Sequence, residues 1–397
     1  MERYLGTISR GIRTPIIQKG DNIVEVTVDS VIKTAQKSNF ELYDNDVIAI
    51  TESVVARAQG NFASIDDIAQ DIQSKFGQES TIGVVFPITS RNRFSICLSG
   101  IARAAKKVVL MLSYPADEMG NHLITLDQLD ENNVNPWSDV LTEERYRELF
   151  GYPKHEFTGM DYVEYYRELT EAEDCELEII FANDCRKILD YTKDVLYCDV
   201  HTRHRTRRLL EESGANLLYG LDDILTKPID GSGYNEEYGL LGCNKATDDT
   251  VKLFPRDCQP VVDAVQKLMY ERTGLHIEAM VYGDGAFKDP VGKIWELADP
   301  VVSPAYTSGL EGRPNEIKLK YLADNDFSNL KGRELEEAIA DYINNKADDL
   351  KGDCASQGTT PRRIPDLLGS LADLTSGSGD KGTPVILIQG YFDSFAV

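Results

Sequence analysis

An aspartate between two glycines is the first candidate for chemistry in this sequence. Asp284 stands in Gly283-Asp284-Gly285, directly after an apolar run from His276 to Tyr282 that predicts a strand. Ligands of α/β proteins gather at the carboxyl ends of strands, and hard divalent cations bind carboxylates together with phosphates. The alternative is an ordinary strand-end turn, because Asp-Gly is a common turn pair. Taken alone, the motif favours the turn.

A second group of compact oxygen ligands lies between Gly242 and Asp249. Asn244, Asp248 and Asp249 have the chemistry of a hard-cation site. A polar loop with a helix cap explains the same residues, and the spacing by itself favours that alternative.

A buried strand followed by a helix start gives a third candidate. The apolar run Asp46 to Thr51 predicts the strand, and Glu52 follows it at once. Backbone amides at the start of a helix attract anions, and Arg57 comes one turn later. Thr51 or Ser53 can instead serve as the N-cap, with Glu52 interacting favourably with the helix dipole. Both interpretations can hold together.

Three other patterns are weaker. The stretch Ser376 to Gly382 does not match a phosphate-binding loop, because no Ser or Thr follows a Gly-Lys pair, so a flexible linker is the better interpretation. Cys198, His201 and His204 are spaced three apart, but four nearby arginines favour a solvated basic helix, with binding of an anionic substrate as the alternative. A Gly-x-Ser-x-Gly motif is absent from the sequence, which disfavours hydrolysis through a covalent serine.

Alternating strands and helices must position these candidates. Before residue 115, apolar periodicity predicts helices over 23–35 and 65–76 and strands over 46–51, 83–86, 93–98 and 108–112. After residue 235, it predicts helices over 260–273, 333–346 and 365–374 and a closing strand over 384–389. Residues 115–235 are richer in Asp, Glu and Tyr. The pattern predicts an α/β protein with mixed sheets.

The composition narrows the functional class. Of the 397 residues 42% are hydrophobic, and 42 Lys+Arg face 66 Asp+Glu, a formal charge of −24. We expect two or three domains and no binding to nucleic acid or to an anionic membrane surface. The sequence has no run that could span a bilayer and no secretion signal after Met1. Seven scattered cysteines indicate free thiols in a reducing compartment. We therefore expect a cytoplasmic protein.

Six blocks occur in an order that resembles one enzyme family. They are Gly11 to Asp21, Asp44 to Gly60, Gly242-Cys243-Asn244, the strand ending at Asp284, Pro365 to Asp373, and Asp380 to Pro384 with the apolar strand that follows. Together they resemble the coenzyme F-420-0:L-glutamate ligases, which add γ-linked glutamate to a deazaflavin precursor. The resemblance covers residues 5–75 and 238–395.

This resemblance implies a γ-glutamyl-ligase-like α/β fold in an intertwined homodimer that uses GTP and Mg²⁺ or Mn²⁺. It divides the chain into an N-terminal ligase segment, 1–114, an insert without a recognised role, 115–235, and a C-terminal ligase segment with the metal site, 236–397. The insert could reshape the acceptor pocket.

The resemblance also implies a metal site. Asp284 matches a metal-binding aspartate of the family, and Asn244 stands where the family usually has a second one. This change removes one charge, for which Asp248 or Asp249 could compensate.

Catalytic and nucleotide-binding roles follow from the same matches. Catalysis is assigned to Glu52, where the family often has Ser or another polar residue, to Arg57, usually Lys, and to Asp366, whose neighbour Leu367 replaces a family Glu. The residues expected at the nucleotide are Gly11, Ile12, Thr51, Ser53 and Lys288.

The reaction implied for the family needs no covalent nucleophile. The γ-phosphoryl group of GTP activates an acceptor carboxylate as an acyl phosphate, and the amine of L-glutamate then attacks it. The partners expected are therefore GTP, L-glutamate and a carboxylate acceptor, deazaflavin-like or other. The alternatives are a ligase of the same fold with a different acceptor, a nucleotide-binding protein without turnover, and an acidic scaffold.

Overall fold

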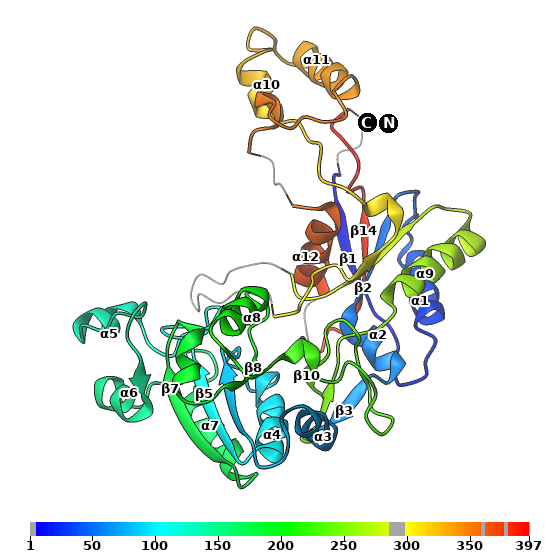
Figure 1. Cartoon of the computed structure of the whole chain (residues 1–397). Coiled ribbons are helices and arrows are strands. Elements are labelled where there is room, and N and C mark those ends of the chain that lie inside the picture. Colours follow the sequence, from blue (N-terminus) through cyan, green and yellow to red (C-terminus); the bar gives the residue numbers. More distant parts are fainter. Residues whose placement is uncertain (1–4, 286–297, 359–361, 377–379, 397) are drawn as a thin grey trace.

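Two main sheets, joined by a small third one, form the body of the protein (Figure 1). The computed structural model describes residues 5–285, 298–358, 362–376 and 380–396. No helix in these ranges is long and apolar enough to cross a membrane.

The first sheet is mixed and carries the strands that precede Glu52 and Asp284. Its order is β1 (Ile8–Ile12), β14 (Val385–Gln389), β2 (Val47–Thr51), β12 (Glu278–Tyr282) and β13 (Ala305–Tyr306). β2 and β12 are parallel, whereas β14 is antiparallel to both β1 and β2. Helices α1 (Ile23–Ser38) and α9 (Cys258–Thr273) pack on one face, and α12 (Ile364–Ser376) packs on the other. With both faces covered, β2 is buried at four of its five positions.

The second sheet is doubly wound. Its order is β6 (Leu141–Thr142), β7 (Glu176–Phe181), β5 (Lys107–Leu112), β4 (Thr81–Val85), β8 (Asp194–Tyr197) and β9 (Leu217–Gly220). All of these strands except β6 run parallel. The chain adds strands outward from β4 to β7 and then resumes at β8 on the other side of β4. The strand order therefore reverses between β4 and β8.

Helices cover both faces of this second sheet. One core contains α3 (Ile65–Phe76), α4 (Phe94–Ala104) and α7 (Tyr162–Glu171). The other contains α8 (Arg203–Glu212) and the 3₁₀ helix η1 (Cys185–Asp190). Two short helices, α5 (Leu126–Glu131) and α6 (Glu143–Phe150), extend from the side of this domain (Figure 1).

Smaller elements complete the fold. A three-stranded sheet, β10 (Asn244–Lys245), β11 (Thr250–Lys252) and β3 (Phe62–Ser64), connects the two large ones. The 3₁₀ helices η2 (Leu221–Asp223) and η3 (Ser308–Leu310) follow β9 and β13. An arm of α10 (Leu319–Asp324), α11 (Arg333–Asn344) and η4 (Cys354–Ser356) has its own small core and projects from the body (Figure 1).

The predicted α/β class is confirmed, and one predicted strand is wrong. Residues 93–98 instead form the N-cap and the first turns of helix α4. Every residue of this helix from Phe94 to Ala102 is buried. The stretch imitates a strand because the large apolar residues Phe94, Ile96 and Leu98 alternate with small ones, which is the two-residue period of a strand. The division at residue 114 stays a prediction. In the structure β5 lies between β4 and β7, so strands from both sides of that residue share one sheet.

Candidate functional site

The site lies where the parallel strands β2 and β12 end side by side. Thr51 pairs with Tyr282 in the last register position. Glu52 begins helix α2 (Glu52–Gln59) directly after β2, and Asp284 follows β12 after one glycine. Parallel pairing thus brings two acidic residues, far apart in the sequence, to one edge of the sheet.

Arg93 connects this edge to the doubly wound domain. It is the N-cap residue of α4, and its Nη2 lies 2.6 Å from Asp284 Oδ2. Its Nη1 lies 3.0 Å from Oδ1 of Asp299, which is 2% exposed. Asp299 also accepts a hydrogen bond of 2.7 Å from the backbone N–H of Asp284 through Oδ2. The guanidinium therefore bridges the carboxylates of two aspartates that are also linked through the main chain of Asp284.

Glu52 has a cation of its own. Lys252, at the end of β11, places Nζ 3.0 Å from Glu52 Oε2, and both residues are buried. Burial raises the pKa of the Glu52 carboxyl, against the opposing effect of the Lys252 ammonium. Lys252, on the β10–β11 hairpin, thus provides the positive charge that pairs with Glu52.

A third acid reaches the edge from helix α12. Asp373 Oδ2 accepts a hydrogen bond of 3.1 Å from the backbone N–H of Gly285. The two glycines around Asp284 allow this close packing. A Cβ on Gly283 would lie 2.7 Å from Asp299 Oδ2, and one on Gly285 would lie 2.8 Å from Ser370 Cα. The Gly-Asp-Gly motif is therefore a packing requirement of the site as well as a strand end.

The edge holds more negative than positive charge. When ionised, the carboxyl groups of Glu52, Asp284, Asp299 and Asp373 outnumber the cations Arg93 and Lys252 by two. Burial, followed by the charge of Asp299, raises the pKa of Asp284 to about 8 in spite of Arg93. Burial opposes the charged form of Arg93, but the carboxylates of Asp299 and Asp284 overcome this and raise its pKa.

These residues suit a hard divalent cation shared with phosphate. No group of three His, Cys, Asp or Glu side chains in the described ranges is arranged to hold a metal by itself. Mg²⁺, however, commonly binds through one or two carboxylates plus substrate phosphates. Burial and the carboxylate of Asp299 disfavour the charged form of Asp284, and a bound divalent cation would relieve this cost. Asp284 and Asp299, whose carboxylates face the same guanidinium, therefore fit a cation that is shared with phosphate.

The predicted nucleotide residues lie around the start of α2 and the end of β1. Thr51 is the N-cap of α2, without a side-chain cap bond, and Ser53 is half-buried in the first turn. Arg57 lies one turn further and donates from Nε to the backbone oxygen of Ile17, at 2.6 Å. Gly11 is exposed on β1, whereas Ile12 has its side chain in the core. At Ile12, therefore, a ligand could contact the backbone but not the side chain.

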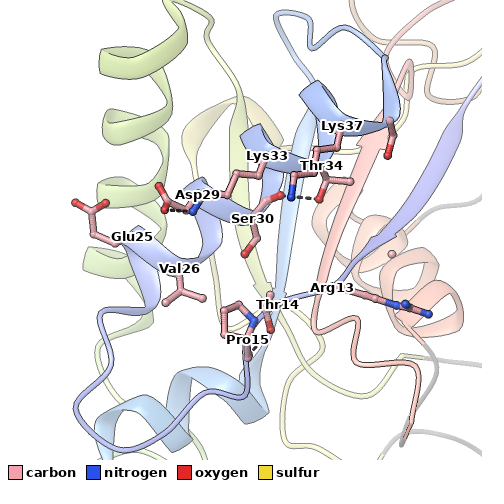
Figure 2. Close-up of a pocket in the computed structure, with 12 residues that line it drawn as sticks. Arg13, Thr14, Pro15, Glu25, Val26, Asp29, Ser30, Lys33, Thr34 and Lys37 are labelled. Carbon is pink, nitrogen blue, oxygen red and sulfur yellow. Dashed lines mark hydrogen bonds and ion pairs between the residues drawn. The ribbon is translucent and has the colours of Figure 1, made fainter.

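A groove of about 610 Å³ runs beside Gly11, between residues 11–15 and helix α1 (Figure 2). Lys33 and Lys37 line it together with Glu25 and Asp29, and Lys33 pairs with Asp29 at 2.6 Å. None of the four acids at the end of β2 and β12 lines it. This mixed-charge groove is thus separate from the carboxylate edge.

Other predicted residues are placed elsewhere. Asp366 accepts hydrogen bonds from Arg363 and from Ser303. The residue of α12 that contacts the Gly283–Gly285 segment is Asp373. Asp248 is fully exposed in the β10–β11 turn and pairs with Lys245, at 2.8 Å. Asn244 pairs with Lys252 across the hairpin. Lys288 lies outside the described residues.

The cysteine and histidine pattern is divided by the structure. Cys198 is buried, whereas His201 and His204 are exposed at and before the start of α8. Within the described residues these three form no metal-binding group. This agrees with the interpretation as a basic helix.

Four site residues were missed by the sequence reasoning: Arg93, Lys252, Asp299 and Asp373. Arg93 was assigned to a strand, which hid its position at a helix start. Asp373 follows Asp366 by two helical turns, so a helical period on α12 was a usable signal for a second acid on the same face. Lys252 and Asp299 carry no local signal, because their partners are distant in sequence.

A comparison with protein families finds a match over nearly the whole chain. The model of the family described as F420-0:Gamma-glutamyl ligase matches residues 11–390. No curated protein matches the chain significantly.

Proposed function

The chain belongs to the F420-0:gamma-glutamyl ligase family, whose members are enzymes that form carbon–nitrogen bonds, and on this basis we propose that it joins L-glutamate to the carboxylate of F420-0 with GTP as co-substrate. The family match covers nearly the whole chain, including residues 115–235.

The excess of buried carboxylates at the end of β2 and β12 carries the proposal. Asp284 and Asp299 would hold Mg²⁺ or Mn²⁺ together with phosphate oxygens of the nucleotide, and Asp373 would support Asp284 through the backbone of Gly285. The cation supplies charge neutralisation at the phosphoryl group when it is bound. We propose Asn244 as a further metal ligand. Asp248 or Asp249 could bind the metal only if the β10–β11 hairpin moved toward the ends of β2 and β12.

The start of α2 supports nucleotide binding at the same edge. The amides near Thr51 and Ser53, the exposed guanidinium of Arg57 and the main chain of Gly11 and Ile12 offer positive or donor groups to phosphates. Lys288 would add another cation.

The proposed reaction has two steps. An oxygen of the acceptor carboxylate attacks the γ-phosphorus of GTP, so that GDP leaves and an acyl phosphate forms. The amine of L-glutamate attacks the acyl carbon, the amide bond forms and inorganic phosphate leaves. The amine loses a proton in this step, and Glu52 is the candidate acceptor because burial raises its pKa. Arg93 would help to neutralise the charge of the phosphoryl group.

A nucleotide-binding protein without turnover is the second candidate. It is favoured by Asn244 at the family's aspartate position and by Arg93, whose guanidinium already bridges Asp284 and Asp299. This alternative predicts GTP binding without acceptor-dependent release of phosphate.

We also propose a cytoplasmic homodimer. Six of the seven cysteines are buried free thiols, which suits a reducing compartment. The dimer rests on the family resemblance, and sedimentation velocity tests it.

Thermal melting with GTP or ATP, with and without Mn²⁺ or Mg²⁺, tests the nucleotide site. Nucleotide at about 100 times its Kd should stabilise the wild type by roughly 2.7 kcal/mol, and Asp284→Ala should remove this shift. Ligation is tested by product analysis with F420-0 and L-glutamate, where GDP and phosphate should appear only when both are present. GTP binding without this release favours the second candidate, and absence of binding contradicts both.

A further inference from the structure

Two buried thiols from distant parts of the chain are in contact close to Arg93. Cys97 lies near the start of α4, and Cys243 comes directly before β10. Their Sγ atoms are 3.5 Å apart, and the exposed fractions of the two residues are 2% and 4%. Because 146 positions separate them in the sequence, only the packing of α4 against the segment before β10 brings them together.

A third thiol nearby has a different partner. Cys198 follows β8 and lines the same small space as Cys97 and Cys243. The hydrogen bond of its Sγ goes to the backbone oxygen of Leu196, at 3.7 Å. The geometry therefore selects Cys97 and Cys243 as the two thiols that can react with each other.

The space beside the three thiols limits which molecules can reach them. Its volume is about 30 Å³, and Ile88 and Phe94 form part of its wall. A space needs roughly 10–15 Å³ to hold one water molecule. Hydrogen peroxide is only one oxygen atom larger than water, whereas disulfide oxidants such as oxidised glutathione are whole peptides. Peroxide is therefore the oxidant that fits this space.

The contact joins two segments on which the carboxylate edge depends. Cys97 comes one turn after Arg93, and its Sγ lies 3.5 Å from the backbone oxygen of Arg93. On the other side of the contact, a Cβ on Gly242 would lie 2.6 Å from Cδ of Pro300. Pro300 directly follows Asp299, the buried partner of Arg93. Movement of either thiol therefore acts on the bridge between Arg93 and Asp299.

We propose that Cys97 and Cys243 form a redox modification site, where hydrogen peroxide produces a disulfide that weakens the contact of Arg93 with Asp299. The sulfurs of a disulfide are about 2 Å apart, so these two have to approach by about 1.5 Å. Part of this movement falls on the first turn of α4, where Arg93 is the N-cap residue. Formation of the disulfide is independent of the proposed function, and its effect on GTP binding rests on that function.

The reaction balances with peroxide as the only co-reactant. One sulfur, as its thiolate, attacks a peroxide oxygen, so that the O–O bond breaks and a sulfenic acid and hydroxide form. The second sulfur attacks the sulfenic sulfur, the S–S bond forms and a second hydroxide leaves. The hydroxides take up the two thiol protons as water, and the two electrons lost by the sulfurs reduce the peroxide. The contact with Cys243 and burial raise the pKa of the Cys97 thiol, so the reaction should be slow.

Disulfide mapping tests the site without any substrate. The full chain is incubated with hydrogen peroxide for hours, catalase removes the excess, free thiols are alkylated in urea, and peptides are analysed without reductant. We expect a linked peptide that contains Cys97 and Cys243, both in the wild type and in Cys198→Ser. The exposed Cys354 is the internal control, because its oxidation shows that the peroxide has acted.

A titration with GTP and Mn²⁺ measures the effect on the carboxylate edge. The fraction of protein that binds GTP should fall in step with the fraction that is linked, and dithiothreitol should restore it. Cys243→Ser cannot form the disulfide and should bind GTP equally well before and after peroxide. This matched variant separates the disulfide from other oxidation, such as that of methionine.

The outcomes separate this inference from the proposed function. Oxidation of Cys354 without a Cys97–Cys243 peptide overturns the site, and so does an equal amount of peptide that links Cys198 to either thiol. Linked protein that binds GTP as well as the reduced protein does overturns the effect on Arg93. Reduced protein that does not bind GTP contradicts the proposed function, whereas the linked peptide would still support the modification site.

Discussion

The two large sheets end in contrasting surroundings that face each other. At the ends of β2 and β12, four carboxyl groups and two cations lie together, of which Glu52, Asp299 and Lys252 are buried and the others half-buried. At the ends of β4 and β8, the side chains around Arg93 include Ile88, Phe94 and Val200, which belong to an apolar core. The ionisable groups of the site therefore gather on one sheet, and Arg93 connects them to an apolar core on the other.

We expect the largest effect on stability from Arg93→Met. The variant leaves Asp284 and Asp299 buried without their shared cation, which costs about 3–5 kcal/mol of unfolding free energy. Urea unfolding measures the loss, and added Mn²⁺ should recover part of it because the carboxylates lack a cation. Arg93→Lys, which keeps the charge without the fork, should lose less. A Met variant as stable as the wild type would show that the bridge contributes nothing.

Asp284→Asn sharpens the description of the charged edge through its pH dependence. Burial and the charge of Asp299 raise the pKa of Asp284 from its ordinary value of 3.8 to about 8 in the folded protein, where Arg93, Glu52 and Asp373 also face it. Between these values the folded state holds a proton that the unfolded state has lost, so the wild type loses stability as pH rises. In metal-free buffer, the melting temperature of Asp284→Asn minus that of the wild type should increase from about pH 5 to about pH 8. A constant difference would contradict the raised pKa.

Asp373→Asn and Asp366→Asn compare two acids on one helix. Asp373 contacts Gly285, and Asp366 contacts Arg363 and Ser303. The first variant should weaken the metal-dependent GTP response about 10-fold. The second should leave this response intact and lose less than about 1 kcal/mol of stability. The reverse ranking would return the catalytic assignment to Asp366.

Asp248→Asn is expected to have the smallest effect. Its carboxylate is fully exposed and pairs only with Lys245 among the described contacts. Solvent screens such a pair, so neither the melting temperature nor the GTP-dependent shift should change measurably. Loss of the metal-dependent shift would show that the hairpin closes over the edge when nucleotide binds.

The elements next to the site were predictable because their signals are local. β2 is a continuous apolar run, and Gly274 ends α9 in the left-handed conformation, with φ 74°. The start of helix α4 was mistaken for a strand, because Phe94, Ile96 and Leu98 alternate with small residues. The strand order of the second sheet also depends on pairing between strands that are distant in the chain.

The sequence by itself determined that this is an α/β protein, that Asp284 ends a strand and that Glu52 starts a helix. Those features depend on spacing within a few residues. Only the tertiary structure decided which charges meet there. Arg93 contacts Asp284 across 191 positions and Asp299 across 206, and Lys252 contacts Glu52 across 200. Contacts at such separations follow from how the sheets pack, and no local pattern encodes them.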